Sequence, residues 1–253
     1  MTELSSQIVF ITGASRGIGA ATALRFAQQG VRRLILHYNS YKPGAEQAAS
    51  AVQALGAEVR LIRADFSTAL GIDDGIKAYR ELGWDADILI NNAGSLVQRA
   101  KLAEFTTDLF DRVMNLNVKS AYFLAQAAAP AMIAKQSGRI INLSSIAARN
   151  GGGPGATIYA AAKAAVAAIT KGLAKELAPA GIRVNAVSPG TVDNDFHAQF
   201  SNRQILDAVV AQTPAGKLGD NEEIADTILF LCTEPSRYIY GQTIEINGGM
   251  YMV

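Results

Sequence analysis

The fold of this chain is decided by the stretch QIVFITGASRGIG, residues Gln7–Gly19, where an apolar strand runs into a glycine-rich turn and then a helix. We expect Gly13 to permit a tight turn, Gly17 to let the backbone approach a pyrophosphate, and Gly19 to let the helix pack close to the sheet. The helix N-terminus then offers free N–H groups and a positive dipole end to phosphates. A turn that merely joins strand to helix is the alternative, although this strand–turn–helix context is the one a phosphate site requires.

Short apolar or β-branched runs alternate with longer helical patterns along the rest of the chain. The predicted strands are Gln7–Ile11, Arg33–His37, Glu58–Arg63, Ile88–Asn91, Arg139–Leu143, Arg183–Ser188 and Thr243–Ile246. The predicted helices begin near Gly17, Ala45, Ile72, Thr107, Thr157 and Glu222. Several strands are continuous apolar runs, which suits a parallel sheet covered on both faces. The pattern predicts an α/β, doubly wound (Rossmann) parallel sheet of about seven strands, with helices on both faces, in a single domain over residues 1–253.

Composition narrows the class of protein. A chain of 253 residues can bury one large core, and its formal net charge of +1 gives no electrostatic footprint for nucleic acid or an anionic membrane. Cys232 is the only cysteine, so no intrachain disulfide can form, and we expect it to be a buried structural residue. The polar N-terminus, Met1–Gln7, is unlike a signal peptide, and no uncharged apolar run is long enough to cross a bilayer. We therefore expect a cytoplasmic protein.

The stretch YAAAK, Tyr159–Lys163, predicts acid–base chemistry. Four residues apart on a helix, Tyr159 and Lys163 lie on one face. A lysine beside a phenol stabilises the phenolate, so we expect the pKa of Tyr159 to fall from about 10 toward neutral. Such a tyrosine can donate or accept a proton near working pH, as carbonyl–alcohol chemistry requires. Tyrosine and lysine also share helix faces by chance, so the spacing alone is weak evidence.

Two serines precede this helix. Ser145 follows the apolar strand that ends at Leu143, so we expect it at the carboxyl edge of the sheet, where open α/β folds bind ligands. Ser144 points to the other side by alternation, and we interpret it as a capping residue. The glycine-rich stretch Gly151–Gly155 is too short for a linker and predicts a mobile active-site loop.

These motifs together resemble the short-chain dehydrogenase/reductase family over nearly the whole chain. The resemblance rests on Thr12–Gly19 (TGxxxGxG), Asn91-Asn92-Ala93-Gly94, Asn117, Ser145, Tyr159-x-x-x-Lys163 and Pro189-Gly190. The chain is similar to the 3-oxoacyl-acyl-carrier-protein reductase branch and to related sugar, polyol and ketone reductases. Because that branch is broad, the substrate does not follow from the resemblance.

The resemblance implies a catalytic role for four residues. Tyr159 is expected to be the acid–base catalyst, with Lys163 as its electrostatic partner and as a ligand of the nicotinamide ribose. Ser145 is expected to hydrogen-bond the substrate oxygen, and Asn117 to hold a water in a proton relay. From the residues alone, Asn117 lies inside a long helical pattern, Thr107–Lys135, where an amide is usually a satisfied polar group or a surface residue.

The resemblance also implies a set of cofactor-binding residues. Asn91 is expected to be mainly structural, while Ala93 and Gly94 contact the cofactor; a plain turn after a strand is the alternative. Asp65 is expected to hydrogen-bond the adenine amino group, or else to cap the next turn. The full set is Gly13, Ser15, Arg16, Gly17, Ile18, Gly19, Tyr38, Asn39, Ser40, Asp65, Phe66, Asn92, Ala93, Gly94, Tyr159, Lys163, Pro189, Gly190 and Val192.

The segment after the second strand indicates which dinucleotide binds. It reads HYNSYK, His37–Lys42, and has no acid, whereas an NAD-preferring site usually offers one there. Arg16, with Ser40 or Lys42, could instead meet a 2′-phosphate, which a carboxylate would repel. We therefore predict NADP(H) as the cofactor, with NAD(H) as the alternative.

Residues 191–215 are expected to form a substrate lid. Asp193 and Asp195 could hydrogen-bond a polyhydroxylated substrate there, but a solvated loop is the preferred interpretation. The family often carries a threonine a few residues after Pro-Gly that contacts the nicotinamide, whereas Thr191 arrives early. His197 has no second ligand nearby, so no metal site is expected.

The expected function is NADPH-dependent reduction of a ketone or 3-oxoacyl carbonyl of a small-molecule substrate to a secondary alcohol. An NAD(P)-dependent alcohol, sugar or polyol dehydrogenase is the first alternative, and a non-catalytic dinucleotide-binding protein is the second. The resemblance also implies a homotetramer. Small residues after Tyr159 would permit close approach of helices, or would pack against this chain's own sheet; they are Ala164, Ala165, Ala167 and Ala168.

Overall fold

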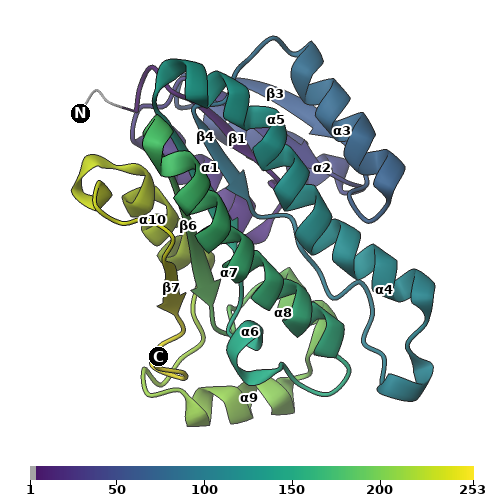
Figure 1. Ribbon diagram of the computed structural model, residues 1–253. Helices are drawn as coiled ribbons and strands as arrows, with labels where there is room; N and C mark the ends of the chain where they lie inside the picture. The colour runs from purple at the N-terminus through teal and green to yellow at the C-terminus, as the bar shows by residue number, and fades with distance from the viewer. Residues whose placement is uncertain (1–3) are drawn as a thin grey trace.

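The structure, a computed structural model, describes residues 4–253, without the side chains of residues 197–199. The described residues form a seven-stranded parallel sheet in the order β3-β2-β1-β4-β5-β6-β7 (Figure 1). The strands are β1 Ile8–Ile11, β2 Arg33–Tyr38, β3 Glu58–Arg63, β4 Ile88–Asn91, β5 Gly138–Leu143, β6 Ile182–Pro189 and β7 Thr243–Ile246. The predicted doubly wound parallel sheet is confirmed, and each predicted strand boundary is correct to within one residue.

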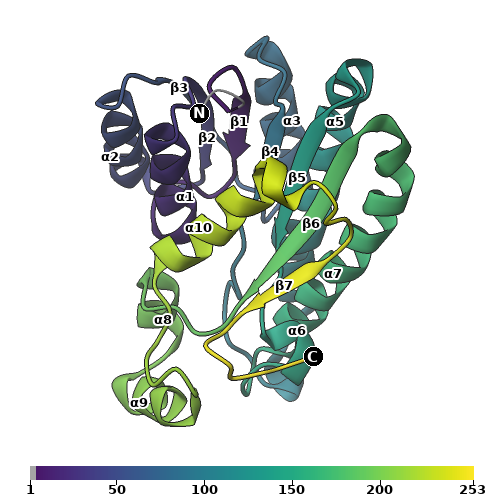
Figure 2. The same ribbon diagram turned by 90° about the vertical axis from the view of Figure 1, so that its left-hand side faces the viewer.

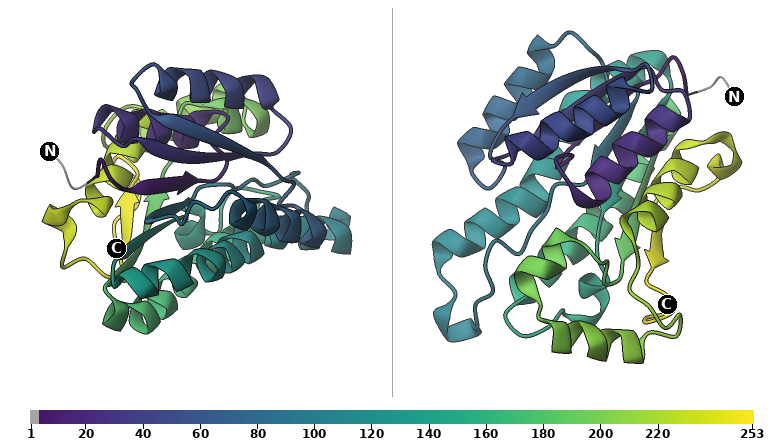
Figure 3. Two further views of the ribbon diagram at one scale, coloured as in Figure 1. Left: turned by 90° about the horizontal axis from the view of Figure 1, so that it is seen from above. Right: turned by 180° about the vertical axis from the view of Figure 1, so that it is seen from behind.

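Helices cover both faces of this sheet, as the views in Figure 3 show. One face carries α1 Gly17–Gln28, α2 Lys42–Gln53 and α10 Asn221–Cys232, and the other carries α3 Ala69–Glu81, α5 Ser120–Lys135 and α7 Thr157–Leu177. Two predicted helices begin three residues earlier than expected. A proline lies in the first turn of α2, and the hydroxyl of Thr68 caps α3 by accepting from the N–H of Gly71.

Two apolar layers, one on each face, hold the helices against the sheet. On one side Phe26 of α1 packs in a cluster with Leu34 and Ile228, and on the other Phe10 and Leu89 pack with Leu124 of α5. Cys232 lies in the first of these clusters, and burial raises the pKa of its thiol to about 12. The prediction of a buried structural cysteine is therefore confirmed.

The long helical pattern predicted over Thr107–Lys135 is interrupted. It consists of α4 Thr107–Met114, a π-helical turn over Asn115–Lys119, and then α5. A π turn is wider than an α turn and commonly marks a functional position, because it redirects one side chain out of the regular pattern. Here the turn contains Asn117, whose side chain is buried.

The remaining helices gather beyond the carboxyl ends of β5–β7, as Figures 1 and 2 show. They are α6 Ala147–Asn150, α8 Asp195–Phe200 and α9 Arg203–Gln212. The chain also forms short 3₁₀ turns at Leu102–Glu104, Ala178–Ala180 and Glu234–Ser236. Helices α8 and α9 occupy the segment predicted as a lid. In the described part of the chain, no helix is both long and apolar enough to span a membrane.

The order of the strands creates a crevice at one point of the sheet. β1 is followed along the chain by its neighbour β2 on one side, whereas β4 on its other side is followed by β5, so the connections that leave β1 and β4 run in opposite directions and leave a crevice between them. The side-chain amide of Asn92, just after β4, donates to the carbonyls of Thr12 (2.8 Å) and Gly13 (2.9 Å) just after β1. The two turns that flank the crevice are thereby fixed to each other.

Candidate active site

The glycine turn adopts the backbone conformation that its sequence predicts. Gly13 (φ +64°) and Gly17 (φ +58°) both lie in the left-handed region that favours glycine. A Cβ on Gly19 would overlap the carbonyl of Gly13, so the close packing at Gly19 is against the turn itself. No side chain caps the N-terminus of α1. The first N–H groups of α1 therefore have no side-chain acceptor at the crevice, as an anion-binding site requires.

His37, to which the sequence assigned no role, supports this turn from beneath. Its Nδ1 accepts from the N–H of Gly13 (3.1 Å), and its Nε2 lies 3.0 Å from the carbonyl of Ala64, to which it donates. The ring stacks on Phe66 with centroids 3.9 Å apart. Burial lowers the pKa of His37 to about 4, so the ring is neutral with its proton on Nε2. A polar residue inside the apolar run RLILHY was the available signal.

One cavity of about 540 Å³ joins the glycine turn to the residues predicted to be catalytic. The predicted cofactor residues that line it are Gly13, Ser15, Arg16, Gly17, Ile18, Asn39, Ser40, Phe66, Asn92, Ala93, Gly94, Tyr159, Lys163, Pro189, Gly190 and Val192. Three others, Gly19, Tyr38 and Asp65, are not among the lining residues. Tyr38 is buried, and a carboxylate oxygen of Asp65 accepts from Asn39 (3.3 Å) and from the N–H of Ser67 (3.0 Å), the contact expected of a turn cap.

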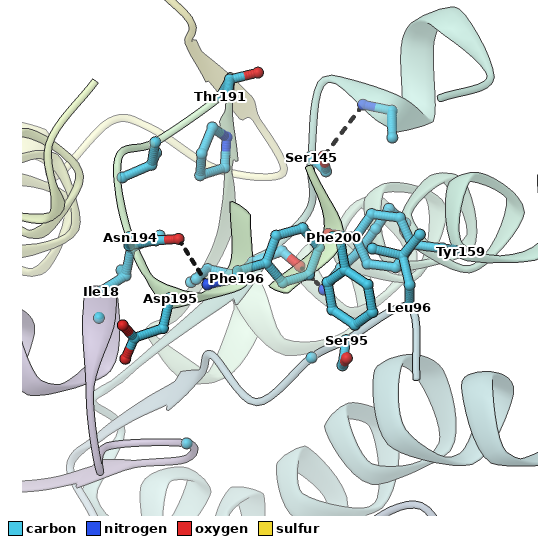
Figure 4. A pocket seen from close by; sticks show the side chains of 18 of the residues that line it. Ile18, Ser95, Leu96, Ser145, Tyr159, Thr191, Asn194, Asp195, Phe196 and Phe200 are labelled. Atoms are coloured by element: carbon cyan, nitrogen blue, oxygen red, sulfur yellow. Dashed lines mark hydrogen bonds between the residues drawn. The ribbon is translucent and has the colours of Figure 1, made fainter. Parts of the chain in front are cut away.

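Tyr159, Ser145 and Lys163 converge at the carboxyl end of β5. Ser145 lies close enough to Tyr159 to lower the pKa of the phenol, and its Oγ accepts from the N–H of Ala147 (3.2 Å; Figure 4). Lys163 lies one turn after Tyr159 on α7, with Nζ 5.6 Å from the centre of the tyrosine ring. The ammonium group donates to the carbonyl of Leu143 (2.7 Å) at the end of β5. The shared helix face predicted for Tyr159 and Lys163 is therefore present.

The predicted fall in the pKa of Tyr159 is wrong for this structure. Burial raises the pKa of Tyr159 to about 12, and the neighbouring hydroxyl of Ser145 offsets only part of that rise. Burial also lowers the pKa of Lys163 to about 7, because the ammonium sits in a site with little solvent. Desolvation is the largest influence on both groups, and the Coulomb attraction on which the sequence argument relied does not reverse it.

Asn117 and Gly94 enclose a small space beside Lys163. The amide nitrogen of Asn117 donates to the carbonyls of Ser95 (2.8 Å) and Val113 (2.9 Å), whereas its buried Oδ1 has no hydrogen-bond partner. A Cβ on Gly94 would lie 2.7 Å from that Oδ1 and 2.8 Å from Nζ of Lys163. The oxygen and the ammonium therefore face the same point, which is open only because residue 94 is glycine. A buried acceptor in such a polar space is suited to hold a water.

Ser144 and Asn91 hold the elements that carry this site. Ser144 is buried, and its hydroxyl donates to the backbone carbonyl of Lys163 (2.9 Å). It ties β5 to α7, so its interpretation as a capping residue is wrong. Asn91 donates to Asn142 (2.9 Å) and to the carbonyl of Ala121 (3.1 Å), and thus links the central strands to α5.

The predicted lid contributes aromatic residues that the sequence analysis did not assign. Phe196 and Phe200 line the cavity from α8, with the ring of Phe196 5.9 Å from that of Tyr159 and 5.1 Å from that of Phe200 (Figure 4). Two aromatic residues four apart in the acidic stretch DNDFHAQF were the available signal. Thr191 also lines the cavity. The side chain of His197, for which no metal role was expected, lies outside the described part of the structure.

Asp195 and Arg16 join the lid to the glycine turn. Their side chains pair at 3.6 Å, and both are more than half exposed. The preferred interpretation of Asp195 as a residue of a solvated loop is therefore incomplete, since this carboxylate faces the cation predicted to bind a 2′-phosphate. In the described residues Asp195 is the only acid that lines the cavity.

Known proteins resemble the chain over its whole length. It is 38% identical over 257 residues to 3-oxoacyl-[acyl-carrier-protein] reductase of Synechocystis sp., covering 100% of both chains. It is 36% identical to the Escherichia coli K12 enzyme of the same name, covering 99% of this chain and 100% of the other. Two similar solved structures are a blue fluorescent protein from a metagenomic library in complex with NADPH (TM-score 0.89, 32% identity, 99% and 100% covered) and a putative gluconate dehydrogenase from Agrobacterium tumefaciens (TM-score 0.90, 31% identity, 99% and 98% covered).

A family model described as enoyl-(acyl carrier protein) reductase matches residues 13–251, which is most of the chain. The match includes the glycine turn, the serine–tyrosine–lysine group and the lid, all of which meet at one cavity. The sequence motifs, the seven-stranded sheet and the full-length relatives all indicate the same family. The chain is a member of the short-chain dehydrogenase/reductase family of oxidoreductases.

Proposed function

We propose that the protein uses NADPH to reduce a ketone or 3-oxoacyl carbonyl to a secondary alcohol. The observation that carries this proposal is the single cavity that joins an uncapped helix N-terminus to Ser145, Tyr159 and Lys163. The 3-oxoacyl reductases among its relatives support the same substrate class. A catalytic domain over residues 1–253, with a lid at about 191–215, is consistent with that arrangement.

The residues at one end of the cavity fit NADP(H). Arg16 lies beside the ring of Tyr41 with its guanidinium carbon 5.6 Å from the ring centre, and Asn39 and Ser40 line the same end. No acid follows β2 to repel a 2′-phosphate, and the uncapped N-terminus of α1 suits the pyrophosphate. The family neighbour in complex with NADPH supports this choice, with NAD(H) as the alternative.

When bound, NADPH supplies the hydride that reaches the carbonyl carbon. Tyr159 donates its proton to the carbonyl oxygen as the alcohol forms, and Ser145 hydrogen-bonds the same oxygen. Together they stabilise the developing alkoxide, to which preorganised donors contribute about 3–4 kcal/mol each in comparable sites. A proton donor with a raised pKa remains protonated until the carbonyl oxygen becomes basic, which suits reduction.

Lys163 and Asn117 are placed to restore the proton that Tyr159 gives away. The ammonium of Lys163 lies near the tyrosine and attracts the phenolate that remains after the transfer. The unpartnered Oδ1 of Asn117 faces the same space as Nζ of Lys163, and a water held there would connect the site to solvent. The family resemblance implies the relay water for Asn117 and the electrostatic role for Lys163.

Oxidation of an alcohol, sugar or polyol by NAD(P)⁺ is the second candidate, because the same residues run the reverse reaction and one structural neighbour is a putative gluconate dehydrogenase. A dinucleotide-binding protein without catalysis is a weaker candidate, since Ser145, Tyr159 and Lys163 are all retained. Initial rates with NADPH plus ketones, compared with rates with NADP⁺ plus polyols, separate the two enzymatic directions.

The test of the proposed function is NADPH oxidation, followed by its absorbance, with a panel of ketones, 3-oxoacyl thioesters and sugars. We expect Tyr159→Phe to abolish turnover while NADPH affinity, measured by nucleotide fluorescence, stays nearly unchanged. Ser144→Ala is a useful companion, because it removes a hydroxyl that positions α7 without touching the substrate oxygen, and we expect only a partial loss. Full activity in Tyr159→Phe would remove the proton-donor assignment.

We further propose a cytoplasmic homotetramer. Ala164 and Ala168 are exposed on α7, and Tyr122 and Phe123 are exposed on the neighbouring α5, so these two helices present small and aromatic residues outward. Light scattering is expected to give the mass of four 26.7 kDa chains. A monomeric mass at assay concentration would exclude the assembly.

A further inference from the structure

Helix α9 is unusual among the longer helices because none of its residues is buried. Its sequence, RQILDAVVAQ, nevertheless carries apolar residues at a helical spacing. Ile205, Leu206 and Val209 form one face, defined here as the inner face of α9, and all three line the cavity. Ile205 remains 49% exposed. An apolar face that lines a cavity without being buried by the chain is suited to a ligand that covers it.

This inner face is continuous with the carbonyl site. Phe196 and Phe200 of α8 line the same cavity as α9 and lie next to Tyr159, and Leu96 adds a buried apolar wall (Figure 4). The path from the hydroxyl that donates the proton to α9 is therefore bordered by aromatic and aliphatic side chains. A carbonyl held by Ser145 and Tyr159 would direct one of its substituents along these walls.

Several polar side chains around this path already bind other parts of the chain. Asn194 donates to Asn221 (3.0 Å) and accepts from the N–H of Phe196 (3.1 Å). Arg99 donates to the carbonyls of Phe200 (2.9 Å) and Pro154 (3.0 Å).

Two further oxygens near the path are also engaged. Oδ1 of Asn150 accepts from the N–H of Gly152 (2.9 Å), and the carboxylate of Asp195 pairs with Arg16 (3.6 Å). A polyol would need such groups for its hydroxyls, since hydroxyls buried without partners weaken binding. An apolar substituent needs none of them.

We propose that the preferred substrate is a ketone or 3-oxoacyl compound with an extended apolar substituent, and that this substituent lies on the inner face of α9. The proposal rests on the proposed reductase function and narrows it. Ile205, Leu206 and Val209 are then residues that determine specificity for the length of the substituent, and sugars and polyols are poor substrates.

The test compares kcat/KM for 2-octanone, 2-butanone and the hydroxylated ketone erythrulose with NADPH. Full burial contributes about 0.8 kcal/mol per methylene, which corresponds to about fourfold in kcat/KM. The four additional methylenes of 2-octanone, partly exposed on α9, are expected to raise kcat/KM roughly 10- to 100-fold over 2-butanone. Erythrulose is expected to fall below 2-butanone.

Variants on the two faces of α9 locate the effect. We expect Ile205→Ser together with Val209→Ser to lower the ratio of kcat/KM for 2-octanone to that for 2-butanone about tenfold. The matched control is Ala208→Ser, which places a serine on the same helix at an exposed position that does not line the cavity, and it should keep the ratio. Because α9 buries no residue, both variants should fold, which circular dichroism checks.

Three outcomes overturn the proposal. The first is a ratio near one in the unaltered protein, and the second is an equal loss in Ala208→Ser. The third is an unchanged ratio accompanied by a lower mass in light scattering for the Ile205→Ser and Val209→Ser variant, which would show that a second copy of the chain covers α9. If no ketone of either length is reduced although NADPH binds, the proposed function itself fails, and this result is distinct from the other three.

Discussion

Acid is expected to destabilise this protein through one buried histidine, His37. The unfolded chain binds a proton at this residue with a pKa of 6.5, whereas burial lowers the pKa of the folded residue to about 4. Between these pH values the unfolded state holds more protons, so the free energy of unfolding falls as the pH falls. Each tenfold difference in proton affinity is worth about 1.4 kcal/mol. His37 therefore lowers the free energy of unfolding by about 2 kcal/mol at pH 5 relative to pH 8, and by roughly 3 kcal/mol at pH 4.

The substitution His37→Asn isolates this contribution. The asparagine oxygen can replace Nδ1 as acceptor for the N–H of Gly13, so the glycine turn keeps its support, but the titration is lost. At pH 8 the variant should be less stable by about 1–3 kcal/mol, because the carbonyl of Ala64 loses its donor and Phe66 loses its stacked ring. At pH 5 this difference should shrink by about 2 kcal/mol, since only the unaltered protein pays for keeping His37 neutral.

Urea unfolding followed by circular dichroism at pH 8, 7, 6 and 5 measures the effect. The chain has two histidines, so both proteins are compared in a His197→Asn background, in which residue 37 is the only difference in histidine content. Carboxylates titrate equally in the two proteins and cancel in the difference. If that difference changes by less than about 0.5 kcal/mol between pH 8 and pH 5, His37 is not held neutral, and the hydrogen bond from Gly13 to its ring is misassigned.

Three more substitutions probe the cavity. Gly94→Ala places a methyl group against Lys163 and Asn117, and we expect kcat to fall about 100-fold with a smaller change in NADPH affinity; steady-state kinetics would contradict this with a loss below threefold. Arg16→Leu should weaken NADPH binding about tenfold and leave NADH binding nearly unchanged. Asp195→Asn removes the carboxylate that pairs with Arg16, so it should tighten NADPH binding two- to fivefold. Equal effects on the two nucleotides in titration calorimetry would exclude recognition of the 2′-phosphate. Lys163→Met removes an ammonium whose pKa is lowered by burial to about 7. The free energy of unfolding in urea at pH 7 should therefore rise by about 1–4 kcal/mol while activity is lost. A less stable variant would refute the desolvation argument.

The local patterns in the sequence were sufficient for the strands and for most of the site. Strands that are apolar at every position must be covered by helices on both faces of the sheet, and Gly13 and Gly17 suit a turn with positive φ. The sheet and its phosphate turn therefore follow from local sequence. The four-residue spacing of Tyr159 and Lys163 placed them correctly on one helix face. These features depend on residues that are near one another along the chain.

The three-dimensional structure decided what depends on distant segments. The direction of the pKa shift at Tyr159 follows from how many side chains surround it, and Phe196 and Phe200 reach it from the lid, about 40 residues along the chain. The π turn that turns Asn117 inward is a small change in helical winding that periodicity does not encode. The sequence thus determined which chemical groups this protein possesses, and their spacing along the chain indicated roughly where they meet. Packing determined their charges, their partners and the apolar wall on α9, because desolvation and contact depend on every segment that folds around a group.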